Sequence, residues 1–382
     1  MNAPGDSKIA VFDETQDMKK RLVHVCFVSP KAYPLFDPKC KAVFGGAEVD
    51  LYNLGVELAK DASFEVSFVT ADYGQPAAVR LQNIQLIRSL SFREGPLAGA
   101  WKVWKALKKA NADIYVIKTA SPAVPLLESF CTLHKKVFVY RSAHQDDCDG
   151  TYARRHRLAG MAYARAVKRA HAVLTQNQTD RDNLQKWLAV EASVIPNGHH
   201  LPPPDRNPRT TILWVGRSAE FKHPERFIEL ARCVPSERFT MICQRATGDT
   251  AYTRLVAQAR AVSNLTFIEQ VPHHEIDVYF RVARVLVNTS DSEGFSNAFI
   301  EACKWSVPIL SLSVNPDNFL TRWSCGLCCG GDQQRLVEGL RFLLENDRYQ
   351  ELGRNARKYA QANHDITQIV EQYKELFRKL AE

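Results

Sequence analysis

TILWVGRSAEFKHPERFIELARCV (residues 211–234) sets the pattern that decides the fold. A short apolar run ends at Gly216 and Arg217, and a helix-length amphipathic stretch opens at Pro224. A continuous apolar run is typical of a parallel strand buried on both faces, and the stretch that follows is typical of a crossover helix. The segment therefore predicts one strand–loop–helix unit of a parallel α/β sheet.

The same alternation repeats on both sides of this segment. It begins upstream at LVHVCFVS (22–29) and continues downstream to VPILSLS (307–313). Between the halves, SVIPNGHHLPPPDRNPRT (193–210) carries five prolines, which continue neither helices nor central strands. The 382 residues also exceed the ~250 to 300 at which single cores stop growing. The sequence therefore predicts an α/β protein with two Rossmann-like, doubly wound parallel-sheet lobes that face a deep cleft.

The expected domain boundaries follow from the same pattern. We predict a flexible N-terminal extension at 1–20, an N-terminal lobe at 21–203 and a C-terminal lobe at 204–382. The linker lies near 198–210, where the prolines gather. Residues 333–382 are helical in composition, and we expect the last helix to pack back on the first lobe.

Composition narrows the class of protein. No stretch approaches the ~18 uncharged apolar residues that span a bilayer, and the N-terminal residues lack the apolar centre of a signal peptide. We therefore expect a cytoplasmic protein. The net charge of +8 attracts diphosphates, anionic lipid headgroups and nucleic acid alike, so charge alone does not choose among these partners.

EGFSNAFIE (293–301) carries the strongest functional signal. Glu293 follows a strand-like run and precedes a helix-like one, so it lies near a helix N-terminus, which exposes N–H donors. Glu301 comes eight residues later, at most ~12 Å along a helix, and helical side chains lean toward the N-terminus. One ligand could therefore engage both carboxylates. The alternative is that Glu293 only favours the helix start and that Glu301 is a surface residue.

This pair of glutamates, separated by the seven residues GFSNAFI, resembles the signature of the family-four (group 1) retaining glycosyltransferases of the GT-B fold. The resemblance extends by motif order over most of the chain. It implies that Glu293 contacts the sugar of a nucleotide-sugar donor and that Glu301 holds the ribose hydroxyls. The other donor contacts expected from this segment are Gly294, Phe295 and Ser296.

Two cations follow the strand with which the analysis began. Arg217 comes directly after the strand and Lys222 lies five residues later. Cations at this place can neutralise the charge that builds on a departing nucleoside diphosphate. Their spacing resembles that of the family, which implies a catalytic and donor-binding role for both. A pair of solvated loop side chains is the alternative.

Residues after strands of the first half complete the expected site. Gly45 and Gly46 open a helix, where glycine lets the backbone approach a ligand, and GGAE resembles the donor-diphosphate loop of the family. His144 ends VFVYRSAH, and the resemblance implies that it approaches the donor sugar. Turn glycines and a loop histidine without a role are the alternatives.

The sequence does not predict a metal site. Asp146 and Asp147 lack complementary His or Cys residues, and CGLCC (325–329) lacks a second pair of ligands. We expect no required cofactor, with the nucleotide sugar as co-substrate.

The resemblance implies a retaining glycosyltransferase that moves a sugar from a nucleotide sugar to an acceptor hydroxyl. The first lobe would bind the acceptor, a saccharide or lipid-linked saccharide, and the pathway would be polysaccharide, lipopolysaccharide or other glycoconjugate biosynthesis. A sugar-nucleotide epimerase or a phosphorylase on the same scaffold is an alternative, because fold does not fix chemistry. A basic nucleic-acid-binding protein would explain the charge, but we find no RNP-like motif and expect no nucleic acid partner.

Two segments combine basic and apolar residues. WKVWKALKKA (101–110) and ARRHRLAGMAYARAVKRAH (153–171) have the composition of helices that lie on anionic membranes. The favoured interpretation is a pair of crossover helices whose cations face water. Peripheral association with the inner face of a membrane is the alternative.

Overall fold

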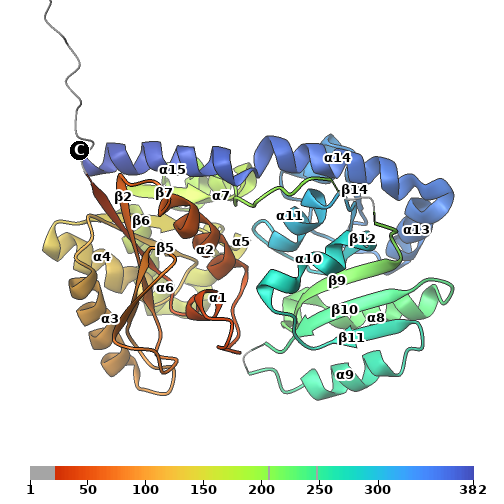
Figure 1. Cartoon of the computed structure of the whole chain (residues 1–382), viewed down its shortest axis with the longest axis horizontal. Coiled ribbons are helices and arrows are strands. Elements are labelled where there is room, and N and C mark those ends of the chain that lie inside the picture. Colours follow the sequence, from red (N-terminus) through yellow and green to blue (C-terminus); the bar gives the residue numbers. More distant parts are fainter. Residues whose placement is uncertain (1–21, 205–206, 247) are drawn as a thin grey trace, which may run out of the picture.

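The computed structural model describes residues 22–204, 207–246 and 248–382. Two α/β lobes lie side by side (Figure 1). The predicted extension at 1–20 lies outside the described residues, as do two positions of the predicted linker, 205 and 206. The predicted domain boundaries stay predictions.

The N-terminal lobe is built on an eight-stranded sheet in the order β3-β4-β2-β1-β5-β6-β7-β8. All neighbouring strands are parallel except the hairpin of β3 and β4 at the edge. The strands are β1 (Val23–Val28), β2 (Phe64–Thr70), β3 (Ala78–Leu81), β4 (Ile84–Arg88), β5 (Ile114–Lys118), β6 (Val137–Arg141), β7 (Ala172–Thr175) and β8 (Ser193–Val194). The helices are α1 (Tyr33–Phe36), α2 (Gly46–Leu58), α3 (Pro96–Ala110), α4 (Ala123–His134), α5 (Gln145–Cys148), α6 (Thr151–Lys168) and α7 (Gln178–Leu188).

The C-terminal lobe has a six-stranded parallel sheet in the order β11-β10-β9-β12-β13-β14. Its strands are β9 (Thr211–Arg217), β10 (Phe239–Gln244), β11 (Leu265–Ile268), β12 (Ala283–Asn288), β13 (Ile309–Ser311) and β14 (Gly326–Cys328). Its α-helices are α8 (Pro224–Cys233), α9 (Tyr252–Arg260), α10 (Asp277–Arg281), α11 (Asn297–Lys304), α12 (Phe319–Arg322), α13 (Gln333–Leu344) and α14 (Arg348–Asn363). Short 3-10 turns are η1 (Glu220–Lys222), η2 (His273–Glu275), η3 (Pro316–Asn318) and η4 (Glu345–Asp347).

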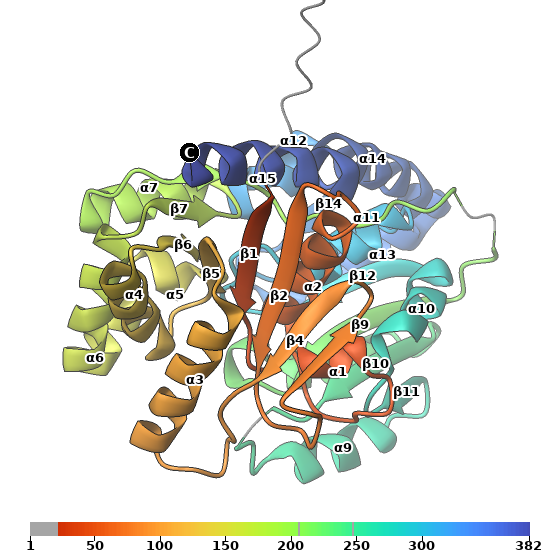
Figure 2. The same ribbon diagram turned by 60° about the vertical axis from the view of Figure 1, so that its left-hand side comes forward.

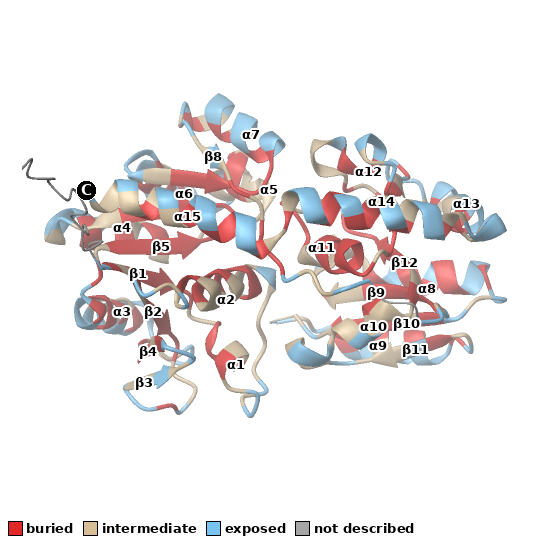
Figure 3. Cartoon of the chain, turned by 45° about the horizontal axis from the view of Figure 1, so that its top comes forward, coloured by how far each residue is buried: buried red, intermediate tan, exposed pale blue. Residues whose placement is uncertain are grey.

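The prediction of two doubly wound parallel-sheet lobes is confirmed. Residues 211–234 form β9, η1 and α8, as their pattern predicts. The strands are buried in both lobes, and exposed residues lie on the outer sides of the helices (Figure 3). Apolar runs without alternation fit strands that helices cover on both faces. Among the described residues, no helix has the length and apolar character needed to cross a lipid bilayer.

The last helix, α15 (Ile366–Ala381), runs back along the first lobe (Figure 1). Its apolar stripe, which includes Ile369, Tyr373 and Phe377, is buried in the core that also contains strands β1 and β2. On its polar side, the Lys374 ammonium lies 2.9 Å from a carboxylate oxygen of Asp61. The C-terminal residues therefore belong to the packing of the N-terminal lobe.

The strand order fixes where a ligand can bind. Successive connections change direction at β1, which lies between β2 and β5, and at β9, which lies between β10 and β12. In doubly wound sheets, crevices open beyond the carboxyl ends of the strands at these switch points. The loops after β1 and β9 are therefore the expected walls of a binding site.

Candidate functional site

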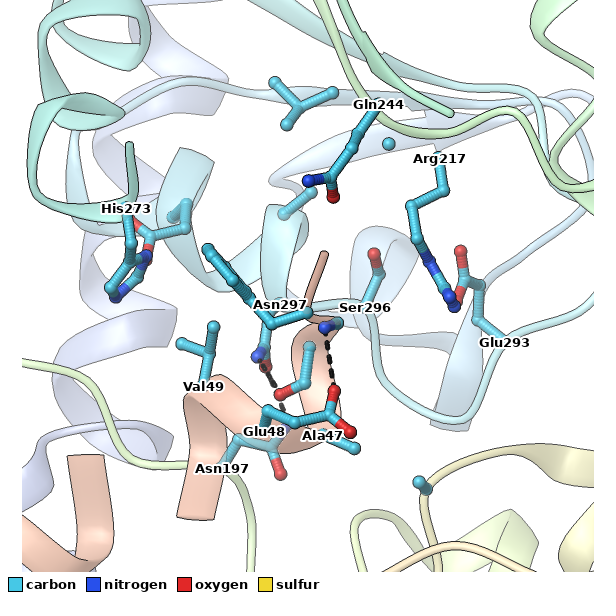
Figure 4. A pocket seen from close by; sticks show the side chains of 18 of the residues that line it. Ala47, Glu48, Val49, Asn197, Arg217, Gln244, His273, Glu293, Ser296 and Asn297 are labelled. Atoms are coloured by element: carbon cyan, nitrogen blue, oxygen red, sulfur yellow. Dashed lines mark hydrogen bonds between the residues drawn. The ribbon is translucent and has the colours of Figure 1, made fainter. Parts of the chain in front are cut away.

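A cavity of about 540 Å³ lies between the lobes, beyond the carboxyl ends of the central strands. Figure 4 shows side chains from both lobes around it. A smaller cavity of about 150 Å³ is lined by the loop that contains Gly294. Nearly all the residues predicted from sequence line the larger cavity: Gly45, Gly46, His144, Arg217, Lys222, Glu293, Phe295, Ser296 and Glu301. Gly294 lines the smaller one.

Glu293 and Lys222 form an ion pair at the cavity wall. The same carboxylate oxygen accepts a hydrogen bond from the Ser290 hydroxyl at 2.9 Å. Arg217 comes from the end of β9 and extends toward the cavity on the side of Glu293 (Figure 4). Within the described part of the chain, its guanidinium has no hydrogen bond or ion pair. The two predicted cations therefore differ, because the charge of Lys222 is neutralised by Glu293 and the charge of Arg217 is not.

The start of α2 faces the start of α11 across the cleft. Glu48 accepts a hydrogen bond from the Gly45 N–H at 2.7 Å, and the Asn297 amide donates to the Gly46 carbonyl at 2.8 Å. A Cβ on Gly46 would lie 3.2 Å from the Asn297 amide nitrogen, and one on Gly45 would lie 3.8 Å from the Arg217 guanidinium. The positive ends of two helix dipoles and one free cation thus converge, which favours a bound anion.

Glu301 is buried and ionised. Its carboxylate lies 3.1 Å from His199 Nδ1 and 2.6 Å from the Lys304 ammonium. Burial alone would raise the pKa of Glu301, but the Lys304 ammonium and His199 outweigh it and hold that pKa well below its usual range. His273 lines the same cavity (Figure 4), and burial lowers its pKa, although the Glu301 carboxylate opposes this shift. Glu301 is therefore a fixed hydrogen-bond acceptor at neutral pH.

His144 supplies a free ring nitrogen at the wall of the cavity. Its Nδ1 accepts a hydrogen bond from the Asp146 N–H at 3.2 Å, which leaves the proton of a neutral ring on Nε2. This Nε2 is buried and has no hydrogen-bond partner among the described residues, and the same is true of the Gln176 amide nitrogen beside it in the lining. The ring meets Phe221 of the second lobe edge to face at 5.3 Å. His144 can thus donate to a polar ligand group.

Phe295 and Ser296 contribute to different parts of the structure. The Phe295 ring stacks or tilts against Phe319, Tyr359 and His364, and the residue is 7% exposed. Its side chain therefore belongs mainly to the core of the second lobe. Ser296 is the N-cap residue of α11, and its side chain makes no capping hydrogen bond, so its hydroxyl is available at the cavity.

Gly294 lies in close contact with the first lobe. The Asn177 amide donates to its carbonyl at 3.2 Å. A Cβ at Gly294 would lie 2.6 Å from the Ala143 carbonyl oxygen and 2.7 Å from the Gln176 amide nitrogen. Glycine is needed here because the first lobe leaves no room for a side chain.

A second contact between the lobes lies beside this glycine. Asp317 accepts hydrogen bonds from the N–H groups of Gln178 and Thr179, at 2.8 and 2.9 Å, and from the Thr179 hydroxyl at 2.9 Å. A residue of the second lobe thus caps α7 of the first. Together, the contacts at Gly294 and Asp317 hold the loop of Glu293 in register with the first lobe.

Asp180 is buried beside these contacts, and burial raises its pKa to about 7, although hydrogen bonding from Asn177 opposes this shift. An unfolded aspartate has a pKa near 3.9, so the folded state favours the protonated form between the two values. Stability should therefore fall as the pH rises through this window. We expect Asp180→Asn to remove this loss of stability. Between pH 5 and pH 7, the difference in melting temperature between the variant and the wild type should shift by roughly 5 °C in favour of the variant.

Melting curves recorded from pH 5 to pH 8 would check this expectation. Asp182→Asn is the matched control, because Asp182 lies exposed on the same helix. The raised pKa of Asp180 would be contradicted if the difference in melting temperature between variant and wild type did not change with pH, or if the control showed the same change.

Sequence reasoning missed several residues of the site. Asn297 lies inside EGFSNAFIE, so its position was visible but its partner was not. Asn197 belongs to a turn to which the sequence analysis assigned no part of the site, yet its side-chain amide nitrogen donates to Asn297 at 2.8 Å and its side-chain Oδ1 accepts from Lys118 at 3.2 Å. His199 follows the same turn and pairs with Glu301. Of the described residues, no three or more His, Cys, Asp or Glu are grouped so that they could hold a metal ion.

Two family models match consecutive parts of the chain. Residues 44–201 match the model described as Glycosyltransferase Family 4, and residues 202–361 match the one described as Glycosyl transferases group 1. A curated relative, the O-antigen chain mannosyltransferase RfbU of Salmonella typhimurium, is 27% identical over 174 residues. That match covers 40% of this chain and 49% of the relative, so it spans only about half of the relative's length.

Solved structures share the two-lobed architecture over nearly the whole chain. Sucrose-phosphate synthase from Thermosynechococcus elongatus has a TM-score of 0.76 and 20% identity, covering 94% of this chain and 99% of that one. HepE from Anabaena, in complex with UDP-glucose, has a TM-score of 0.70 and 15% identity, covering 93% and 99%. At these identities the likeness establishes the fold alone.

Proposed function

The chain belongs to the group 1 glycosyltransferases of family 4, with the GT-B fold, and from this membership we propose that it is a retaining transferase. It moves a sugar from a nucleotide-sugar donor to an acceptor hydroxyl. One observation carries the proposal most directly: the unpaired guanidinium of Arg217 lies where the N-termini of α2 and α11 converge on the cavity. Such a place suits a diphosphate.

In the proposed complex, the donor lies along the cavity wall of the second lobe. Glu301 accepts hydrogen bonds from the ribose hydroxyls, since it is ionised and fixed by His199 and Lys304. The diphosphate lies at Arg217 and the two helix starts. The transferred sugar then lies between Glu293 and the free Nε2 of His144, which come from opposite lobes. The UDP-glucose bound by the related fold HepE supports a nucleotide-sugar donor.

The proposed retention does not use a double displacement, because every described carboxylate that lines the cavity is already engaged. Glu48 accepts from the Gly45 N–H, Glu293 pairs with Lys222, and Glu301 pairs with His199 and Lys304. A double displacement needs a free carboxylate as nucleophile. In the proposed step, the bond from the anomeric carbon to the diphosphate oxygen breaks, the acceptor oxygen bonds to that carbon on the same face, and the departing diphosphate oxygen takes the acceptor proton.

The leaving diphosphate gains negative charge as its bond breaks. Arg217 and the helix N-termini are preorganised donors for this charge, so they stabilise the transition state more than the ground state. In this scheme no further cofactor is required, and a chelator is expected to change the rate little. The acceptor is a saccharide or a lipid-linked saccharide of glycoconjugate biosynthesis, which the partial similarity to an O-antigen mannosyltransferase supports.

Donor binding can be tested by thermal shift with a panel of UDP-, GDP- and ADP-sugars. A donor at 100 times its Kd is expected to stabilise the protein by about 2.7 kcal/mol. Glu301→Gln should weaken the binding of that donor by roughly 10-fold or more and raise its KM, because a charged acceptor for hydroxyls is lost. Glu229→Gln, at an exposed position of α8, is the control.

The alternatives give different outcomes. Equal donor affinity in the Glu301→Gln variant and the wild type would refute the ribose contact. Conversion of the sugar nucleotide to an isomer without any acceptor would favour an epimerase. The anomeric configuration of the first product formed, read by NMR, tests retention directly.

A further inference from the structure

Two helices of the N-terminal lobe, α3 and α6, contain no acidic residue. Their basic side chains are all exposed, and they supply nine of the 50 lysines and arginines of the chain. These are Lys102, Lys105, Lys108 and Lys109 on α3, and Arg154, Arg155, Arg157, Arg165 and Lys168 on α6.

The same two helices expose large apolar side chains. On α3, Leu97 is 89% exposed and Trp101 is 58% exposed, and on α6, Leu158 is 81% and Met161 is 69% exposed. The inner side of α3 is buried through Val103 and its neighbours, so burial against the sheet accounts for only part of the apolar composition. The favoured sequence interpretation, crossover helices whose cations face water, therefore describes only part of what these helices expose.

Cations and apolar groups interleave on this surface. The Lys105 ammonium lies 3.4 Å from the centroid of the exposed Trp101 ring. On α6, exposed arginines stand on both sides of Leu158 and Met161. Helix α4 packs between α3 and α6, and we call the exposed side chains of α3 and α6 on either side of it the basic-apolar face. Alternation of this kind is typical of surfaces that rest in the headgroup region of an anionic bilayer.

The face lies next to the mouth of the cleft. Helices α3, α4 and α6 cover one side of the first sheet (Figure 2). Since α3 and α6 each lead into a parallel strand, they run opposite to that strand and begin at the edge where the cavity lies. The Arg155 guanidinium lies 3.4 Å from the Asp146 carboxylate, two residues beyond the cavity residue His144.

Helix α6 has a strained kink next to its exposed apolar residues. Arg157 has φ 44° and ψ −111° inside the helix, a conformation that L residues rarely adopt. A Cβ on Gly160 would lie 2.2 Å from the Ala153 carbonyl oxygen, so the first turns of α6 fold back closely on this glycine. Strain of this kind persists where the surrounding structure demands it, and it often marks functional surfaces.

We propose that the basic-apolar face docks this protein on a lipid bilayer that contains anionic lipid. Leu97, Trp101, Leu158 and Met161 enter the interface, and the lysines and arginines lie among the headgroups. Charge alone would also suit nucleic acid, but large exposed aliphatic side chains add nothing to contacts with a phosphate backbone. Docking does not depend on glycosyl transfer, although it would bring the cleft mouth near lipid-linked acceptors.

Flotation of the full chain with vesicles, without donor or acceptor, tests the proposal. Binding to phosphatidylcholine vesicles that contain phosphatidylglycerol should be at least roughly 10-fold tighter than to phosphatidylcholine alone, and high salt should weaken it. The double change Leu158→Glu and Met161→Glu should lower binding by roughly 10-fold or more, because it removes apolar area and adds negative charge.

The matched control is Val278→Glu with Phe342→Glu, two exposed apolar positions of the second lobe, 53% and 46% exposed. It should keep full binding. Circular dichroism and melting curves show whether each variant is folded. The single change Arg165→Gln, at an exposed position of α6 away from the kink, removes one positive charge and should weaken binding to anionic vesicles only. The proposal is overturned by equal binding to both vesicle types, by equal loss in the control, or by preferential binding of single-stranded RNA that vesicles do not displace.

Discussion

Arg217→Ala is expected to lower kcat and kcat/KM together by roughly 100- to 1000-fold, which is the typical cost of removing one preorganised donor to a developing anion. The free energy of unfolding should hardly change. Among the described residues the guanidinium has no ion pair or hydrogen bond, so its removal leaves no partner unsatisfied. Arg217 is therefore expected to act mainly by stabilising the transition state of the reaction.

Lys222→Ala provides the informative comparison. Lys222 pairs with Glu293, whose side chain is only 11% exposed, so this variant should lose both activity and thermal stability. Steady-state kinetics and melting curves of both variants, with the exposed Arg232→Ala of α8 as control, would separate the two cases. An Arg217→Ala enzyme with undiminished kcat would rule out the proposed role of the guanidinium.

The fold could be predicted because central parallel strands have a strong local signal. Runs such as Val23–Val28 and Ile212–Val215 are apolar without alternation, since both faces of each strand are covered. The antiparallel hairpin at the edge of the first sheet was not predicted. Ala78–Leu81 is only partly buried, and its two-residue turn uses Gln82 and Asn83, both with positive φ. A short exposed edge strand therefore leaves no apolar run to detect.

The walls of the candidate site could be predicted for a related reason. Residues directly after parallel strands reach the same edge of a sheet, so Arg217 and His144 could be assigned to the cleft before the structure was known. The contacts across the cleft could not be predicted from the sequence. The hydrogen bond from Asn297 to the Gly46 carbonyl joins residues 251 positions apart, and the bond from Gln178 to Asp317 joins residues 139 apart. Such pairs depend on how two separate sheets face each other.

The same dependence makes Gly294 a sensitive position between the lobes. Gly294→Ala adds one methyl group at a point where the Ala143 carbonyl oxygen would lie 2.6 Å away. The backbone of Gly294 is outside the left-handed region, so the added atom acts by its volume and not by local strain. The lobes can relieve the overlap by moving apart.

We expect this variant to keep the fold of each lobe and to lose roughly 100-fold in kcat, because catalytic groups displaced by about 1 Å lose that much. Glu293 would move away from His144, and α7 would lose its cap from Asp317. Gly95→Ala is the matched control, since no atom lies within 4 Å of the added carbon. Kinetics together with small-angle scattering would check the result. Full activity at unchanged dimensions would mean that the sugar site does not need this close approach of the lobes.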